Sequence, residues 1–447
     1  MQLITNGRLI TRDPAHPYYE HGAVAFSGTK IVEAGEECLL RTRYPDAHMI
    51  DAKGGVIMPA FINAHTHIYS ALARGLSIRG NNPTNFLQVL EGTWWAIDRK
   101  LTLAGTKASA QALYIDCIKQ GVTTIFDHHA SYCQIPGSLF AIAEVAMDMG
   151  IRSCLCYEVS DRDGEEKCLE AIQENEQFLA WCQQAQDPML RAMFGGHALF
   201  TLSDRTFERM AQANNSRTGY HIHVSEGMND VYDSLRNYGR RPVQRLQDHG
   251  ILGPKTILGH CIHVNTAEIE LLKETGTMVV NNPESNMGNA VGTCPVLPLF
   301  RHGVLVGLGT DAYTNDMLES AKAALCVQRA NACLPNVGWQ EVTDMLFRNN
   351  AEIAGRYFPE PLGVLRPGAA ADIIVMDYKP FTPFSGENLD GHMLFGMTGR
   401  QCQTTIANGK VLMQDRVLTG IDEEAVNASI REEAGKLWNS LNGCETY

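Results

Sequence analysis

The sequence lacks the features of a secreted, membrane-spanning or nucleic-acid-binding protein. Its first residues, MQLITNGRLITRD, contain no basic stretch followed by an apolar one, and no run approaches the roughly 18 apolar residues of a membrane span. Lys and Arg total 37 against 50 Asp and Glu, giving a net charge of −13, whereas a nucleic-acid surface needs clustered positive charge. We therefore predict a cytoplasmic protein that has neither a nucleic-acid nor a membrane partner.

Several common catalytic motifs are absent as well. The chain contains no P-loop, no GxGxxG, no GxSxG and no HExxH. Its 13 cysteines include no CxxC pair, which excludes the zinc deaminases that hold their metal with a Pro-Cys-x-x-Cys motif. The cysteines are therefore expected to be free thiols, and any metal must be bound by other side chains.

What the sequence does contain is a repeated pattern of short apolar runs separated by longer segments with helical spacing. This alternation is typical of βα units, and eight parallel strands with crossover helices close into a barrel. We predict an α/β protein with a (β/α)8 barrel of the TIM type, whose active site lies at the carboxyl ends of the strands. The eight runs span residues 55–67, 121–129, 151–159, 190–198, 219–226, 255–263, 275–285 and 303–312.

The two ends of the chain have a different pattern, with short alternating strands and Asn-Gly turns at Asn6-Gly7 and Asn408-Gly409. Neither end carries enough apolar surface for its own core, so we expect the two to pack together. The prediction is a discontinuous β-sandwich domain from 1–57 and 363–447, which ends in an amphipathic helix, beside a barrel domain spanning 58–362.

Four side chains at the predicted strand ends form a candidate metal site. His65 and His67 are two residues apart on one strand and therefore face the same side. His223 ends the fifth run and Asp311 the eighth, and strand ends converge on the barrel axis. Isolated His-x-His pairs are more often satisfied by local hydrogen bonds, but this context favours ligands. Three imidazoles and one carboxylate suit zinc or ferrous iron better than magnesium or calcium.

Three further polar residues follow the strands. Glu226, three residues after His223, is our candidate general acid/base, although a loop glutamate is usually only solvated. His260 ends the sixth run and could hold the attacking water or the developing oxyanion. His197 ends the fourth run and could donate to the substrate, or could equally be a core histidine.

The segment after the first run contains aromatic and amide side chains that could hold a flat heterocycle. They are Asn85, Phe86, Gln88, Trp94 and Trp95. We predict a substrate contact for Gln88, whereas a core position is the better expectation for the tryptophans.

With these residues assembled, the chain resembles the amidohydrolase superfamily, in particular its branch of cyclic-amidine deaminases and triazine chlorohydrolases. The resemblance rests on MPAFINAHTHIYSALARG, GYHIHVSE, LGHCIH, LGTDAYTNDM and LGVLRPGAAADIIVMD, and it covers nearly the whole chain. Binuclear relatives bridge two metals with a lysine on the fourth strand, which LRAMFGGHA lacks. One departure is that the family often has His-Asn-Pro-x-Ser-Asn after the seventh strand, whereas this chain has Asn281-Asn282-Pro283-Glu284-Ser285-Asn286, where Glu284 adds a negative charge.

The resemblance implies an enzyme that uses one divalent metal ion per chain, zinc before iron, to activate a water for hydrolytic deamination of a nitrogen heterocycle. Glu226 would pass the water's proton to the ring nitrogen, Asp311 would move a second proton to the departing amine, and His260 would hold the oxygen. Hydrolytic ring opening of a cyclic amide and dechlorination would use the same site, and a non-catalytic metal-binding scaffold is a distant alternative. The resemblance also implies a small heterocyclic substrate and a homodimer or larger homo-oligomer.

Overall fold

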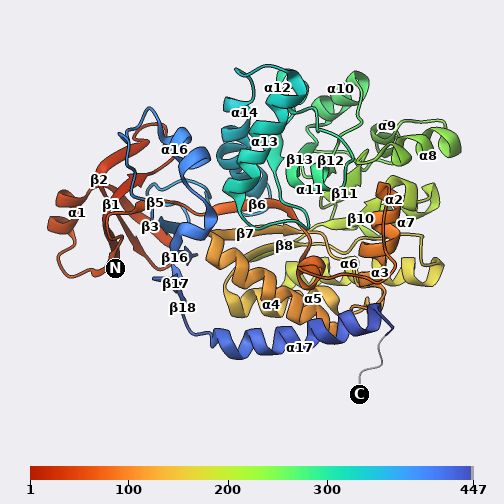
Figure 1. The fold of residues 1–447 in the computed structure, drawn as a ribbon, viewed down its shortest axis with the longest axis horizontal. Helices are drawn as coiled ribbons and strands as arrows, with labels where there is room; N and C mark the ends of the chain where they lie inside the picture. Colours follow the sequence, from red (N-terminus) through yellow and green to blue (C-terminus); the bar gives the residue numbers. More distant parts are fainter. Residues whose placement is uncertain (444–447) are drawn as a thin grey trace.

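The computed structural model describes residues 1–443 and has a barrel beside a nine-stranded sheet (Figure 1). The barrel strands are β6 (Phe61–Thr66), β7 (Val122–Asp127), β8 (Arg152–Leu155), β9 (Leu190–Ala192), β10 (Phe194–Ala198), β11 (Tyr220–Val224), β12 (Ile257–His260), β13 (Met278–Asn281) and β14 (Val306–Leu308). β6 to β9 form one parallel sheet and β10 to β14 another. Nearly every residue in these strands is buried, as expected for parallel strands covered on both faces.

The two parallel sheets join into one ring. β9 and β10 belong to a single run interrupted only at Met193, and a parallel bridge joins Val159 to Gly196. On the other side, Thr66 and Asp311 form a parallel bridge between the end of β6 and the residues after β14. All eight predicted runs contribute a barrel strand, which confirms the predicted (β/α)8 architecture.

Helices follow the barrel strands and cover the outside of the ring (Figure 1). The longer ones are α4 (Leu103–Gln120), α5 (Ser138–Met149), α6 (Glu165–Ala185), α7 (Asp204–Ala213), α8 (Met228–Tyr238), α10 (Thr266–Thr275) and α13 (Met317–Ala332). Local sequence sets their ends: α10 begins at a capping box of Asn265 with Glu268 and ends at Gly276, which has a left-handed backbone.

The nine-stranded sheet contains both ends of the chain, in the order β18-β17-β16-β15-β5-β1-β2-β3 with β4 beside β1. Its strands are β1 (Gln2–Ile10), β2 (Tyr18–Ser27), β3 (Lys30–Glu36), β4 (His48–Asp51), β5 (Val56–Pro59), β15 (Ile373–Met376), β16 (Cys402–Ala407), β17 (Lys410–Gln414) and β18 (Val417–Leu418). The first predicted run, 55–67, is divided: β5 pairs with β1 and β15, and only β6 enters the barrel. The predicted boundary after residue 57 therefore falls within β5, and the domain limits stay a prediction.

The last helix, α17 (Glu423–Leu441), has the predicted position in the sequence but packs beneath α4 of the barrel rather than against the sheet (Figure 1). The indole Nε1 of Trp438 donates to the carbonyl oxygen of Leu72 at 2.7 Å. The helix thereby supports the segment that follows β6, which forms part of the site described below.

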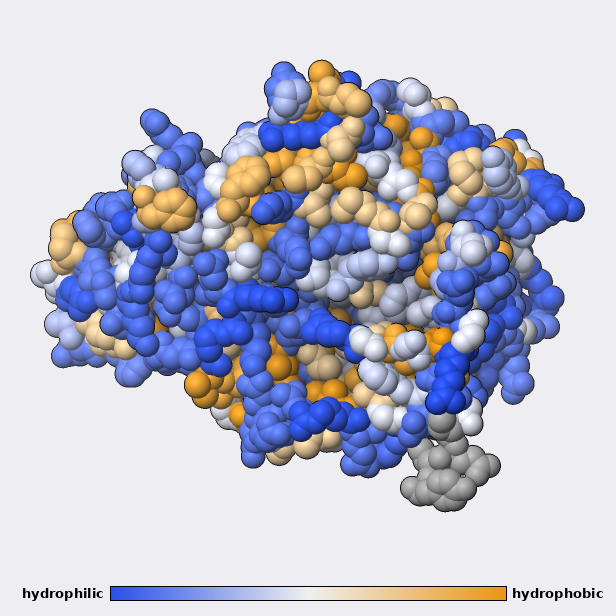
Figure 2. Space-filling view, in the orientation of Figure 1, coloured by the Kyte–Doolittle hydropathy of each residue, from blue (hydrophilic) through white to orange (hydrophobic). Residues whose placement is uncertain are grey.

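The surface in Figure 2 is mostly hydrophilic, with apolar side chains gathered over the helices at its top. Leu334, after α13, and Phe395, on α16 (Leu389–Gly396), are about half exposed. No helix within residues 1–443 combines the length and apolar character needed to cross a bilayer. The predicted homo-oligomer stays a prediction.

Candidate active site

The four predicted ligands meet at the carboxyl ends of the barrel strands. His67 Nε2 lies 3.2 Å from His223 Nε2 and 2.9 Å from Asp311 Oδ1, and His65 Nε2 lies 3.9 Å from the same oxygen. All four side chains are at least nine-tenths buried. The close approach requires Gly309, because a Cβ there would lie 2.8 Å from the Cβ of His65.

Hydrogen bonds at the far side of two of these rings fix their tautomers. Nδ1 of His67 lies 2.5 Å from the carbonyl oxygen of His128, and Nδ1 of His223 lies 3.0 Å from that of His197. A carbonyl oxygen only accepts, so each Nδ1 carries the hydrogen and each Nε2 presents a lone pair. The third ring, His65, contacts His221 Nε2 through its Nδ1 at 2.8 Å.

This donor set fits a divalent cation. Among the described residues, His65 Nε2 is buried and has no hydrogen-bonding partner, while the lone pairs of His67 and His223 point at one another. Bond lengths near 2.05 Å in a tetrahedral zinc site place neighbouring ligand atoms roughly 3.3 Å apart, close to the 3.2 Å between these two nitrogens. Without a cation, such an arrangement would leave buried acceptors facing acceptors.

Asp311 is held in place by Ser285, a residue of the motif after the seventh run that was assigned no role from the sequence alone. The hydroxyl of Ser285 donates to Asp311 Oδ2, and Asn289 Nδ2 donates to the Ser285 hydroxyl at 3.1 Å. The Ser285 contact fixes Oδ2 and leaves Oδ1 toward His65 and His67, where the carboxylate is available as a ligand.

Glu226 and His260 lie together beside this set. Glu226 Oε2 is 3.6 Å from His260 Nε2, which is also 3.8 Å from Asp311 Oδ2. Burial raises the pKa of Glu226 to about 7, although His260 acts against the increase. A carboxyl group that titrates near neutral pH can both accept and return a proton, as a general acid/base must.

Left-handed backbone conformations accumulate at these strand ends. Ser225, His260 and Asp311 have φ values of 50°, 68° and 54°, which non-glycine residues seldom adopt. Asp230 stabilises the turn before Glu226 by accepting from the amide nitrogen of Ser225 at 2.6 Å. Such conformations are retained where the surrounding structure fixes them, as is common in active sites.

A cleft of about 570 Å³ opens onto the ligands. His197 lies on its wall, with Nδ1 2.8 Å from the hydroxyl of Thr201, and burial lowers the pKa of His197 to about 4. The apolar part of the wall comes from Phe86, Leu90, Trp94 and Phe200. A neutral imidazole between aromatic side chains suits a flat, neutral ligand.

Gln88 is not brought to this wall. Phe86, Leu90 and Trp94 line the cleft at a spacing of four residues, so Gln88 lies on the other face of the helical segment that begins with α2 (Phe86–Val89). Its side chain is exposed, and Oε1 accepts from the amide nitrogen of Thr84 at 2.8 Å. The helical period already indicated in the sequence that Gln88 and Phe86 face different ways. The contact of Gln88 with substrate stays a prediction.

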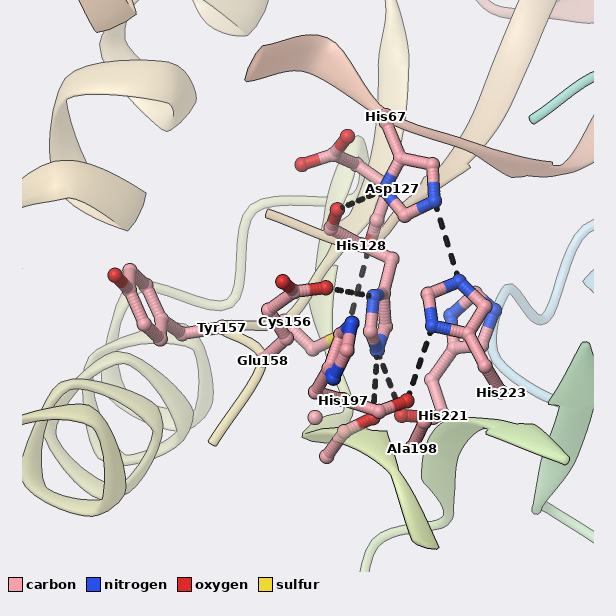
Figure 3. Close-up of polar contacts among 12 residues, drawn as sticks. His67, Asp127, His128, Cys156, Tyr157, Glu158, His197, Ala198, His221 and His223 are labelled. Carbon is pink, nitrogen blue, oxygen red and sulfur yellow. Dashed lines mark hydrogen bonds and ion pairs between the residues drawn. The ribbon is translucent and has the colours of Figure 1, made fainter. Parts of the chain in front are cut away.

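Two residues near the ligands carried a weaker signal in the sequence. Glu158, just after β8, lines the cleft, and the His128 ring lies beside its carboxylate (Figure 3). Both belong to predicted runs and follow strands, but neither has a motif of its own. Their proximity to His67 depends on barrel closure, which a local pattern does not reveal.

Comparison with known proteins identifies the class of this chain. The family model described as "Amidohydrolase family" matches residues 56–412. The chain is 30% identical to the 5'-deoxyadenosine deaminase of Methanosarcina barkeri, over 98% of this chain and 99% of that protein. It is 32% identical to the 5-methylthioadenosine/S-adenosylhomocysteine deaminase of Thermococcus onnurineus, over 88% and 90% of the two chains.

Solved structures share the fold. An adenosine deaminase from Xanthomonas campestris with bound zinc superposes with a TM-score of 0.84 at 24% identity, covering 98% of both chains. The atrazine chlorohydrolase TrzN from Arthrobacter aurescens superposes with a TM-score of 0.82 at 24% identity, covering 97% of this chain and all of that one. The chain belongs to the amidohydrolase family, and the predictions of its family, barrel fold, enzyme class and divalent metal are confirmed.

Proposed function

We propose that this enzyme removes an amino group from an amidine-type carbon of a nitrogen heterocycle by hydrolysis and releases ammonia. The observation that carries the proposal is Glu226, a carboxylate whose pKa is about 7 and which faces the same cleft as His67, His223 and Asp311. Ammonia departs only after the ring nitrogen and the amine have each received a proton. A carboxyl group that exchanges protons near neutral pH is suited to that task.

Zinc is the ion that we propose for the site, held by His65, His67, His223 and Asp311. Imidazole nitrogens with one carboxylate are common zinc ligands, and the described residues that line the cleft include no lysine that could bridge a second ion. The zinc-containing deaminase of the same fold supports this choice. When bound, such an ion lowers the pKa of a water molecule from near 15.7 to about 7 and so supplies a nucleophile at neutral pH.

The protein's own groups then move the protons. Glu226 accepts a proton from the attacking water and delivers it to the ring nitrogen, while Asp311 takes the remaining proton from the oxygen that has added to the ring carbon and passes it to the amine as it departs. His260 has its Nε2 between the two carboxylates, at 3.6 and 3.8 Å. From there, with a hydrogen on both ring nitrogens, it can donate to the oxygen of the attacking water as negative charge develops.

The cleft favours a flat substrate. Phe86, Trp94 and Phe200 supply aromatic surface, and His197 supplies a polar contact at its edge. Two curated relatives are named as deaminases of adenosine derivatives, so purines with an exocyclic amine are the first candidates. Pterins, pyrimidines and triazines have the same amidine group and belong in the same test.

A panel assay for ammonia tests the proposal. The zinc-loaded enzyme is incubated with amino-substituted purines, nucleosides, pterins, pyrimidines and triazines, and ammonia and ring products are measured together. We expect one ammonia per turnover with the ring intact for at least one compound. A ring-opened acid without ammonia, or chloride released from a chlorotriazine in the absence of any deamination, would replace the proposed reaction with one of its alternatives.

A further inference from the structure

Glu158 is a buried acidic group that faces the cleft and has no part in the proton transfers above. It follows β8, its residue is 1% exposed, and its carboxylate lies close to His128 and His197 (Figure 3). Burial raises the pKa of Glu158, but the His197 and His128 imidazoles outweigh it and lower the value to about 2. A negative charge is thus present at the wall of the cleft, and the proton transfers proposed above do not use it.

The protein satisfies this carboxylate only in part. Oε2 lies 3.0 Å from His128 Nδ1, but the contact lacks hydrogen-bond geometry, and Oε2 has no hydrogen-bonding partner among the described residues. Oε1 lies 3.9 Å from Arg162, whose guanidinium is closer to Asp98. Buried carboxylates are normally saturated with donors, so an unsatisfied one at a cleft wall indicates a donor that comes from a ligand.

The other acidic groups of the cleft are already engaged. Asp230 accepts from the amide nitrogens of Ser225 and Phe200, and Asp311 belongs to the metal set. Glu226 lies against His260. No lysine or arginine is among the described residues that line the cleft. Away from the metal ligands, a phosphate or carboxylate on the ligand would therefore meet only like charge, and this wall of the cleft favours a neutral or cationic group.

We propose that Glu158 is a specificity-determining residue, which accepts hydrogen bonds from N–H donors on the substrate edge remote from the departing amine. The inference rests on the proposed function and narrows its substrate class. The preferred heterocycle carries a second amino group next to a ring N–H, because a carboxylate binds such an edge through two parallel hydrogen bonds. Rings that lack this second donor are expected to bind more weakly.

Binding to an enzyme that cannot turn over tests this inference separately from the reaction. The metal-loaded Glu226→Gln protein is titrated in a calorimeter with benzimidazole and with 2-aminobenzimidazole, which differ by one amino donor. We expect the amino compound to bind on the order of 10- to 100-fold more tightly, the usual effect of a hydrogen bond to a charged group. Adding Glu158→Gln should remove this preference, because a single amide oxygen can still accept from the ring N–H that both probes share but no second oxygen is left for the amino donor.

Three outcomes overturn the proposal. Equal affinities for the two probes, or a preference that survives Glu158→Gln, would show that Glu158 does not recognise the donor. Two ions per chain, one of which is lost in Glu158→Gln, would assign the residue to a metal through its neighbours His197 and His223. If Glu158→Gln does not fold, Glu158→Asp keeps the charge but withdraws it by one methylene, and should weaken the preference. None of these readouts depends on ammonia release.

Discussion

His260 Nδ1 lies 2.8 Å from Oδ1 of Asn286, and this contact sets the direction of the histidine's other nitrogen. The amide of Asn286 is itself oriented, because its Nδ2 lies 3.3 Å from Asn281 Oδ1. The oxygen of Asn286 therefore faces His260, whose Nδ1 donates to it, and Nε2 is left toward Glu226 and Asp311. Asn281, at the position where the family often has histidine, thus helps to orient Asn286 and, through it, His260.

Removing that support should slow the reaction without removing the metal. We expect Asn286→Ala to reduce kcat by about 10- to 100-fold, the usual effect of a residue that orients another, with unchanged metal content. Asn286→Asp keeps an acceptor for His260 Nδ1 and should retain more activity than the alanine variant. Steady-state kinetics with metal analysis of both proteins measures this. Wild-type turnover in Asn286→Ala would mean that His260 needs no partner.

The metal set predicts the stoichiometry and the effect of removing a ligand. Metal analysis of the purified enzyme should give close to one zinc or iron per chain, and His67→Ala should lose the ion together with activity. The barrel should survive, because its core is a large cluster of buried apolar side chains rather than the metal. Circular dichroism checks the fold. Two tightly held ions, or unfolding of the variant, would contradict the mononuclear catalytic site.

The metal ligands could be predicted because each follows an apolar run, and barrel geometry brings the ends of such runs together. This geometry is sufficient to predict the ligand set of His65, His67, His223 and Asp311. The division of residues 55–67 between two sheets was not predicted, since VIMPAFI is a continuous apolar run in which Pro59 is the single break signal. The pairing of β5 with β1 and with β15, which is more than 300 residues away in the chain, separates the two strands.

The residues that orient the site were harder to predict, because their partners come from distant parts of the sequence. Asn286 and Ser285 were visible as a motif, but their partner His260 ends β12 and their partner Asp311 follows β14. Glu158 has no motif, and its place at the cleft follows from the closure of the ring. The substrate contact of Gln88 was predicted from its residue type alone, whereas the helical period places Phe86, and not Gln88, at the wall of the cleft.

A buried ion pair joins the barrel to the sheet and should be sensitive to the loss of one partner. The guanidinium of Arg152, on β8, contacts Asp372, which also accepts from the hydroxyl of Thr123 at 2.9 Å and from the amide nitrogen of Asn408 at 2.7 Å. We expect Asp372→Asn to lower the free energy of unfolding by about 3–5 kcal/mol, because a buried cation loses its partner. The double variant Arg152→Met/Asp372→Asn should recover part of this loss in urea unfolding. Strict additivity of the two substitutions would argue against coupling.

Glu284 should make stability depend on pH. Burial raises the pKa of Glu284 to about 7, although the Ser320 hydroxyl, 2.6 Å away, acts to lower it. The folded state therefore holds this proton more tightly than the unfolded state, whose pKa is near 4.5. The contribution is complete below pH 4.5 and is lost as the pH rises to about 7.

Glu284→Gln keeps a hydrogen bond to Ser320 but cannot ionise. Relative to wild type, we expect the variant to gain stability between pH 5 and pH 8 by on the order of 1 kcal/mol, since solvent at this partly exposed group screens part of the effect. Parallel thermal unfolding curves at each pH measure the difference. A difference that is constant with pH would place the ionisation of Glu284 outside this range.

Glu226 gives the sharpest test of the mechanism, because Glu226→Gln removes the charge and keeps the shape. The residue is not a ligand, so the variant should hold its metal normally, and substrate binding should change little. Without the proton shuttle, kcat should fall on the order of 10²–10⁴, the usual contribution of general acid/base catalysis. Glu284→Gln is the matched control, because it makes the same change at another carboxyl group with a pKa of about 7 that bonds Ser320 rather than facing the cleft. It should leave kcat unchanged. Full turnover in a metal-loaded Glu226→Gln enzyme would remove this residue from the mechanism, and with it the main reason to prefer deamination over ring opening.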